Sequence, residues 1–272
     1  MCAPFIMLLT IHAFVRRGDC SKQVPLVFVA MTGRTSADYE HVLKAIKRGL
    51  RNQQEVEEVV CDFEKAIWKA MRRVFPTVLM KGCSFHWGQA VWRHIQGLGL
   101  STEYMNNHGT YSLLRMIFCL PFLPAEHIIE VFDKMEDFNT SEHLEPLFQY
   151  LRRTWFESST WTVENWSVFG QSVRTNNDCE GWHRRLNIRA GVSPPFYNLI
   201  KLLYKEARFV ESQVRLVSEM KLRRMQRKTY RSMQSQIFQA WDSYRAKQLS
   251  ATALLKKVSS LYQPRVLRQE AE

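Results

Sequence analysis

The sequence lacks the cysteine pattern of a zinc ribbon, a zinc finger or a disulfide-stapled domain. It has six cysteines, and none of them belongs to a C-x-x-C pair: Cys2, Cys20, Cys61, Cys83, Cys119 and Cys179. A chain of 272 residues, 46% of them hydrophobic, can bury a core without disulfide bonds. We therefore expect reduced thiols and an intracellular protein.

The first residues of the chain lack the pattern of a secretion signal or a membrane span. Residues 1–14 are mostly apolar, but no Lys or Arg precedes the apolar run and no cleavage-site pattern follows it. The run is too short to cross a bilayer. We interpret it as a buried strand and expect no membrane partner.

The sequence contains none of the common catalytic signatures. The distribution of its charge, by contrast, indicates the kind of partner that it binds. There is no Gly-rich phosphate-binding loop and no Ser/His/Asp nucleophile elbow. Residues 181–272 hold 19 Lys and Arg against 6 Asp and Glu, a net charge of +13, whereas residues 1–180 have a net charge of −1. A positive excess confined to the last third indicates a polyanionic partner, most commonly nucleic acid.

The densest part of this excess is the segment Lys221–Arg231, which contains no acidic residue. Its basic residues would wrap around more than one face of a helix, which suits contact with phosphates. We therefore predict a DNA-binding segment carried by Lys221, Arg223, Arg224, Arg227, Lys228 and Arg231. A solvated helix face that binds nothing would have the same composition.

The order of apolar runs and turn residues predicts an α/β fold. Two apolar runs joined by the turn-rich residues 16–22 predict a hairpin, and two strand–helix units follow it. This order implies a mixed sheet with helices packed on its faces. The expected strands are Phe5–Val15, Val24–Met31, Val56–Cys61 and Val78–Cys83, and the expected helices begin at Thr35 or Ser36, after Asp62 and at Phe85.

After residue 100 the periodicity is helical only, which predicts a domain organisation in four parts. Residues 1–100 would form the first part of the core, and residues 101–173 a helical insertion with helices at Thr110–Leu120, Ala125–Asp137 and Glu142–Trp155. Residues 174–195 would return to the core as a helix over 177–190. Residues 196–272 would form one long basic helical region.

This last region contains an apolar heptad seam. Its members repeat at spacings of 3-4-3-4-3: Ile200, Leu203, Ala207, Val210, Val214 and Val217. Such a seam packs either on the core of its own chain or on a second copy, as a homo-oligomer.

Two carboxylates are candidates for a metal site. Asp62 ends a predicted parallel strand, at the sheet edge where ligands usually bind, although it could equally cap the following helix. Glu180 lies on a polar stripe with His183, Arg184 and Asn187, beside an apolar stripe that includes Trp182 and Leu186. It could instead form a capping box with Asn177.

Cys83 and His86 are spaced as Cys-x-x-His at a strand-to-helix junction. A thiolate and an imidazole could share a metal ion, but no further pair is spaced to complete a zinc site. A structural role is expected instead, with Cys83 buried and His86 hydrogen-bonded near the strand ends.

Three blocks of the sequence, taken in order, resemble the Mutator-like element (MULE) transposase domain. They are Cys61–Ala66 (CDFEKA) followed by Arg73–Pro76, then Gly82–Ala90 (GCSFHWGQA), and Arg174–Asn187 (RTNNDCEGWHRRLN). The resemblance covers the chain from about Phe5 to Arg208. It implies a ribonuclease-H-like fold, a nuclear protein acting on DNA, and an Asp-Asp-Glu site in which two Mg²⁺ or Mn²⁺ ions act on a phosphodiester.

Carried over position by position, the resemblance makes Asp62 the second acidic residue and Glu180 the third, with Cys83 and His86 in support. The family's first Asp lies on a strand before the one that begins at Phe5, and this sequence does not show it. The only acidic residue before Asp38 is Asp19, which falls in the predicted turn. We expect an N-terminally truncated gene model, or a relic or domesticated derivative without strand-transfer activity.

Three functions fit these observations. The first is a transposase-derived DNA-binding protein whose catalytic site is incomplete. The second is an active metal-dependent transposase or nuclease whose first Asp lies upstream. The third is a non-enzymatic helical oligomerisation module that acts through the heptad seam.

Overall fold

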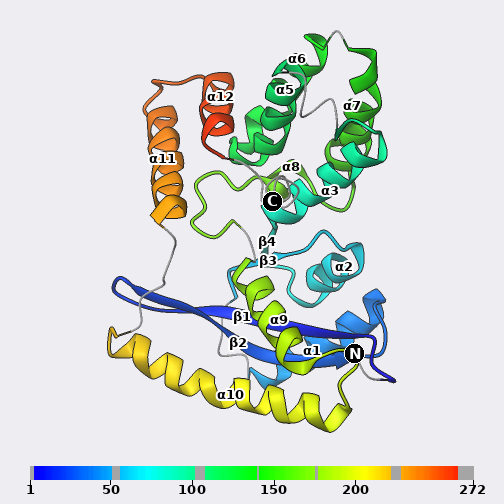
Figure 1. The fold of residues 1–272 in the computed structure, drawn as a ribbon, viewed down its shortest axis with the longest axis vertical. Coiled ribbons are helices and arrows are strands. Elements are labelled where there is room, and N and C mark those ends of the chain that lie inside the picture. The colour runs from blue at the N-terminus through cyan, green and yellow to red at the C-terminus, as the bar shows by residue number, and fades with distance from the viewer. Residues whose placement is uncertain are drawn as a thin grey trace. The chain divides into compact units, whose positions relative to one another are not determined.

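The structure is a computed structural model that describes residues 3–50, 56–101, 108–139, 141–174, 177–221 and 228–262. Two strands and a helix come first, two strand–helix pairs follow, and the remaining elements are all helical (Figure 1). This order confirms the predicted α/β class. No described helix is both long enough and apolar enough to cross a membrane.

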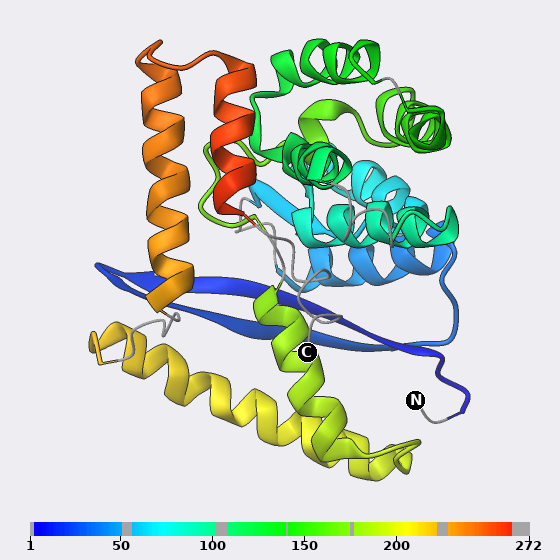
Figure 2. The same ribbon diagram turned by 45° about the horizontal axis from the view of Figure 1, so that its top comes forward.

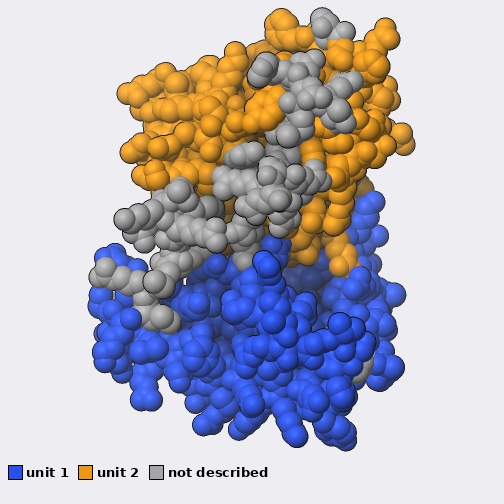
Figure 3. Space-filling view, in the orientation of Figure 1, with its two compact units in different colours: residues 1–55, 65–77, 176–226 blue, residues 56–64, 78–175, 227–272 orange. Residues whose placement is uncertain are grey.

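The chain divides into two compact units, coloured separately in Figure 3. Unit 1 comprises residues 1–55, 65–77 and 176–226, and unit 2 comprises residues 56–64, 78–175 and 227–272. The chain therefore passes between the units several times. The four-part domain division predicted from the sequence stays a prediction, because compactness alone does not decide which segments form the core.

Unit 1 is built on the predicted hairpin. Strands β1 (Met7–Arg17) and β2 (Cys20–Met31) pair antiparallel and include residues that were expected in the turn. The turn itself is Gly18-Asp19, where glycine takes a φ of 51° that other residues rarely adopt. The register shifts between Ile11 and His12, which leaves Leu26 as an extra, exposed residue of a β-bulge.

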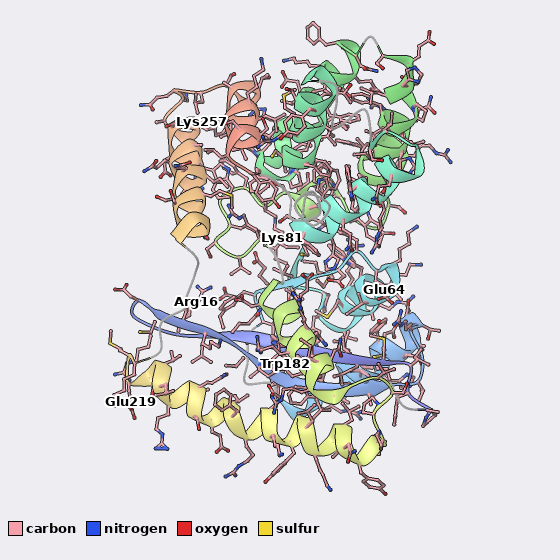
Figure 4. The ribbon with its side chains drawn as sticks, in the orientation of Figure 1. Arg16, Glu64, Lys81, Trp182, Glu219 and Lys257 are labelled. Carbon is pink, nitrogen blue, oxygen red and sulfur yellow. The ribbon has the colours of Figure 1, made fainter. Side chains whose placement is uncertain are left out.

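One face of the hairpin is covered by two helices. They are α9 (Asn177–Ala190) and α10 (Phe196–Ser218), and α10 runs alongside the hairpin in both ribbon views (Figures 1 and 2). The buried cluster between these elements contains Trp182, Leu186, Leu199 and Leu203, packed against Leu8, Phe28 and Leu202. In Figure 4, Trp182 lies between α9 and the strands.

The other helices of unit 1 follow the sequence prediction closely. Helix α1 (Ser36–Gly49) begins after Thr35, whose side chain forms a capping box with Asp38. It packs against α2 (Lys65–Val74). Lys47 Nζ donates a hydrogen bond to the carbonyl of Val74 at 2.9 Å, which joins the two helices at their C-terminal ends.

The region after residue 196 is helical in its described part, but its helices are interrupted. Helix α10 ends at Ser218, and Met220 adopts a left-handed φ of 57°. The N–H of Met220 donates to the carbonyl of Val217 and that of Lys221 to Leu216, which is a Schellman cap formed without glycine. Two separate helices follow, α11 (Lys228–Arg245) and α12 (Ala251–Leu261).

Unit 2 contains the second pair of strands, β3 (Glu58–Cys61) and β4 (Leu79–Gly82), which are parallel. The sequence predicts one mixed sheet, but the described strands form two separate two-stranded sheets. The reason lies in the hydrogen bonding: β3 and β4 pair with each other over four residues, and the longer β1 and β2 pair only with each other.

Unit 2 is mostly helical, both in the expected core residues before 100 and in the range 101–173 of the predicted insertion. It includes α3 (Ser84–Gly97), α5 (His108–Cys119), a 3-10 turn at Leu120–Phe122, α6 (Ala125–Asp137), a 3-10 turn at Glu142–Leu144, α7 (Glu145–Leu151), a π-helical turn at Arg152–Phe156, and α8 (Val163–Trp166). Indole and phenyl rings fill its core, with Trp87 stacked on Trp166 at a centroid distance of 4.7 Å.

Helices α11 and α12 belong to unit 2 and pack against each other, and α12 also packs against α5. Trp241 of α11 is fully buried, and its Nε1–H donates to the carbonyl of Phe122 at 2.9 Å. Leu254, Leu255 and Val258 of α12 are also fully buried. These two helices therefore complete a hydrophobic core.

Candidate functional site

Asp62 is positioned by the carboxyl end of β3, as predicted. Its Oδ1 lies 3.0 Å from Nδ1 of His86, which stands in the first turn of α3. The Asp62 side chain is 54% exposed and that of His86 is 23% exposed, so the pair lies at the surface. Because α2 begins at Lys65, the position of its N-cap falls on Glu64 and not on Asp62.

The protonation of His86 is set by two opposing effects. Burial is the larger effect and lowers the pKa of the His86 imidazole, whereas the negative charge of Asp62 raises it. The net shift of the pKa is downward, so the neutral imidazole is favoured at pH 7.

Cys83 is buried, as predicted. The side chain is fully buried, and the backbone N–H donates to the carbonyl of Cys61 at 3.1 Å. This hydrogen bond continues the β3–β4 pairing by one residue and fixes the start of α3. His86 is thereby held opposite Asp62.

Arg174, the first residue of the third sequence block, meets the second block. Its carbonyl accepts hydrogen bonds from the backbone N–H of Ser84 at 3.0 Å and from the Ser84 hydroxyl at 2.9 Å. The guanidinium is only 6% exposed and stands over the rings of Phe122 and Trp241. Blocks that lie 90 residues apart in the sequence therefore meet at the start of α3.

Glu180 lies on α9 of unit 1, and the two stripes predicted for this helix are present. Trp182 and Leu186 are buried, Glu180 is half-buried, and Arg184 is exposed. The side chain of Asn177, the proposed partner in a capping box, lies outside the described residues. Since Asp62 belongs to unit 2, the predicted site shared by Asp62 and Glu180 stays a prediction.

The residues around Asp62 do not by themselves fit the implied Mg²⁺ or Mn²⁺ ion. In the described ranges, no group of three or more His, Cys, Asp or Glu side chains is arranged to hold a metal. Asp62 and His86 supply one carboxylate and one imidazole, whereas Mg²⁺ is held by several oxygen ligands in octahedral geometry. A metal site here needs further carboxylates.

The structure also contains a polar cluster that the sequence analysis missed. The Thr10 hydroxyl of β1 lies 2.8 Å from Nε2 of His183 on α9 and 3.1 Å from Nε2 of His12. Burial, and then the neighbouring His183, lower the pKa of His12 to about 4, although Asp178 opposes the shift. The sequence does carry a signal for this cluster, because Thr10 and His12 are polar residues at alternate positions of an otherwise apolar strand.

Most of the predicted DNA-binding segment is not described. Lys221 is exposed, and its Nζ lies 2.7 Å from a carboxylate oxygen of Glu219. Arg223, Arg224 and Arg227 lie outside the described residues, as do the side chains of Lys228 and Arg231.

Only alternate members of the predicted heptad seam pack on the hairpin. Leu203 and Val217 are buried and Val210 is half-buried. The intervening members, Ile200, Ala207 and Val214, are exposed. The apolar row of α10 that packs on the chain's own core is offset from the predicted seam and includes Leu199.

Comparison with known proteins gave one match. The sequence of residues 6–90 fits the family model described as the MULE transposase domain. No curated protein matches the chain, and no solved structure does. The matched range contains the hairpin, Asp62 and the Cys83–His86 element.

Proposed function

We propose that the chain is a transposase-derived DNA-binding protein, because residues 6–90 match the MULE transposase domain model and this match supports a transposase-related function. The observation that carries this proposal is that the first two motif blocks and Arg174, the first residue of the third block, meet in unit 2. The backbone N–H of Cys83 donates to the carbonyl of Cys61, Ser84 donates to the carbonyl of Arg174, and Nδ1 of His86 lies 3.0 Å from a carboxylate oxygen of Asp62.

We further propose that the ancestral core is ribonuclease-H-like. The order of a hairpin, a helix and two strand–helix pairs supports this fold, as does the parallel pairing of β3 with β4. In such a core, Asp62 and Glu180 would be the second and third acidic residues of an Asp-Asp-Glu site.

We propose that this chain by itself does not cleave or join DNA. Strands β1 and β2 carry no Asp or Glu that could stand in for the first acidic residue. Two-metal phosphodiester chemistry requires both metal ions to be held, and loss of one carboxylate ligand removes most of that ability.

Nicking of supercoiled plasmid by the purified chain, with Mg²⁺ or Mn²⁺, tests this part of the proposal. We expect no nicking above the buffer control. Robust nicking that disappears in both Asp62→Asn and Glu180→Gln would show that the site is competent, and the active-transposase function would replace ours.

DNA binding would depend on the basic residues after Gly181. Duplex affinity should fall steeply with salt, because each phosphate contact releases roughly 0.9 counterion. Little sequence preference is expected, since phosphates carry no base information. A protein with this role would act in the nucleus, and imaging of a fluorescent fusion in cells would test that location.

A charge-matched pair of variants tests the binding segment. In the first variant, six residues become Gln: Lys221, Arg223, Arg224, Arg227, Lys228 and Arg231. In the control, six exposed basic residues elsewhere become Gln: Arg16, Arg17, Lys65, Lys69, Arg93 and Arg153. Anisotropy titrations over several salt concentrations should show a flatter salt slope and weaker binding in the first variant only. An equal loss of DNA affinity in the two variants would mean that net charge, rather than this segment, drives binding.

A further inference from the structure

Helix α10 presents a second apolar row, distinct from the row that packs on the hairpin. Tyr197, Ile200, Tyr204, Ala207 and Val214 are all exposed, and with Glu211 they repeat at spacings of 3-4-3-4-3. Tyr197 is 77% exposed, Tyr204 64% and Ile200 43%. The heptad pattern is therefore used twice on α10, once against the hairpin and once facing outward.

A basic row flanks this outward seam. Lys201, Arg208 and Arg215 are spaced seven residues apart and therefore occupy the same heptad position, and all three are exposed. Lys205 lies beside them. Among the described residues, no salt bridge involves Lys201, Lys205 or Arg208. Arg215, by contrast, acts on the carboxylate of Glu219, whose pKa its positive charge helps to lower.

The acidic residues of α10 compensate for this row only in part, through Glu211, which lies one helical turn from both Arg208 and Arg215. Glu206 lies on the buried side, where it accepts a hydrogen bond from Trp182 Nε1 at 2.8 Å and pairs with Arg189. Glu211 stands within the outward seam, between Tyr204 and Val214. The face therefore combines an apolar stripe with a one-sided basic edge.

This combination argues against a second copy of the chain as the occupant. In an antiparallel pair of α10 helices, the row Lys201, Arg208 and Arg215 would meet its own copy, and like charges at these positions repel. In a parallel pair it would face the positions of Leu203 and Val210, which pack on the hairpin and supply no acid. Neither arrangement gains an ion pair.

The combination also fits DNA poorly. Phosphates would satisfy the basic row but would leave Ile200 and Val214 facing water. An amphipathic helix with acidic residues on one flank would cover the apolar seam and pair with the basic row together.

We propose that the outer face of α10 binds an acidic amphipathic helix of a partner protein. The seam from Tyr197 to Val214 extends for about 26 Å, at about 1.5 Å per residue, which corresponds to roughly two and a half heptads. The partner helix has apolar residues at heptad spacing and Asp or Glu every seven residues on one flank. This interaction goes beyond the proposed DNA binding and uses different residues.

Two synthetic peptides test the proposal on the unmodified full chain. Each has about three heptads with Leu at the seam positions, and the flanking positions are Glu in one peptide and Lys in the other. Fluorescence anisotropy should show the Glu peptide binding at least about tenfold more tightly than the Lys peptide. Equal binding of the two peptides, or binding of neither, overturns the proposal.

Variants locate the peptide on α10. Lys201→Glu, Arg208→Glu and Arg215→Glu together should reverse the preference in favour of the Lys peptide. The control reverses three exposed arginines of unit 1 that lie off the seam: Arg17, Arg184 and Arg185. Ile200→Asp should abolish binding of both peptides. Circular dichroism of each variant reports whether it has folded, and an equal effect of the control variant overturns the proposal.

Two further measurements separate the competing occupants. If sedimentation velocity shows a dimer that Ile200→Asp dissolves, the face is an interface between copies. If the triple reversal weakens duplex DNA binding and leaves peptide binding unchanged, the face is part of the DNA site. The six-Gln variant of the Lys221–Arg231 segment should bind the Glu peptide normally, so failure of DNA binding is distinguishable from failure of this proposal.

Discussion

The hydroxyl of Thr10 lies 2.8 Å from Nε2 of His183, and this hydrogen bond joins the hairpin to the helix that carries Glu180. Trp182, the neighbour of His183, is stacked on Phe28 of the hairpin at a centroid distance of 5.5 Å. Helix α9 is therefore held on β1 and β2 by a polar contact and an apolar one. The orientation of Glu180 follows from this attachment.

The stability of the chain should fall as the pH is lowered from about 6.5 to 4. His12 has its pKa lowered to about 4 in the folded protein, against an ordinary value of 6.5. Within this window the unfolded chain binds the proton and the folded chain does not, so acid favours unfolding. Because His12 is partly exposed, we expect a loss of about 1–2 kcal/mol.

Urea unfolding at pH 7 and at pH 4, followed by circular dichroism, measures this loss. His12→Gln removes the titrating group and should make the free energy of unfolding less dependent on pH. His41, which is exposed on α1, provides the control variant His41→Gln. An identical pH dependence in the parent and in His12→Gln would rule out this origin for the effect.

Much of the local structure could be predicted because its causes are local. Thr35 and Asp38 are three residues apart, and their capping box fixes the start of α1 as expected. The bounds of α6 and α9 coincide with the predicted ranges 125–137 and 177–190. Helix periodicity, capping residues and turn residues are sufficient at this scale.

The remaining features depend on contacts between distant residues or on weak local signals. Thr10 and His183 are 173 residues apart. No sequence pattern around either residue indicates that the two side chains meet. The end of α10 could not be foreseen because Met220, rather than glycine, takes the left-handed conformation. Asp62 and His86 were both singled out, but only the structure pairs them.

Removal of the Asp62 charge should lower the pKa of His86 further. Asp62 is the main influence that raises this pKa against the effect of burial, so Asp62→Asn leaves burial unopposed. Titration of the His86 ring protons by NMR in the parent and in Asp62→Asn measures the change. Asp133→Asn, a charge change on α6, serves as the control. A higher pKa in Asp62→Asn would mean that the two side chains are not paired as described.

Helix α11 should contribute strongly to the stability of unit 2 through Trp241. Trp241→Ala leaves a large cavity in a fully buried position and should cost about 3–5 kcal/mol. Trp241→Phe keeps most of the ring and loses the hydrogen bond to Phe122, at a cost of about 1–2 kcal/mol. Gln239→Ala, at an exposed position of the same helix, should change stability by less than about 0.5 kcal/mol. Chemical unfolding of the three variants gives these values, and a mild effect of Trp241→Ala would show that α11 does not pack in this core.

The two apolar rows of α10 should respond differently to truncation. Leu203 is 8% exposed in the cluster with Trp182 and Leu186, so Leu203→Ala should destabilise the chain by about 2–4 kcal/mol. Ile200 is one turn away and 43% exposed, so Ile200→Ala should cost less than about 1 kcal/mol. Both changes remove branched aliphatic side chains of equal volume, so the difference in unfolding free energy reports burial alone. Similar costs at the two positions would mean that α10 is rotated from the orientation described, and the outward seam would then be part of the core.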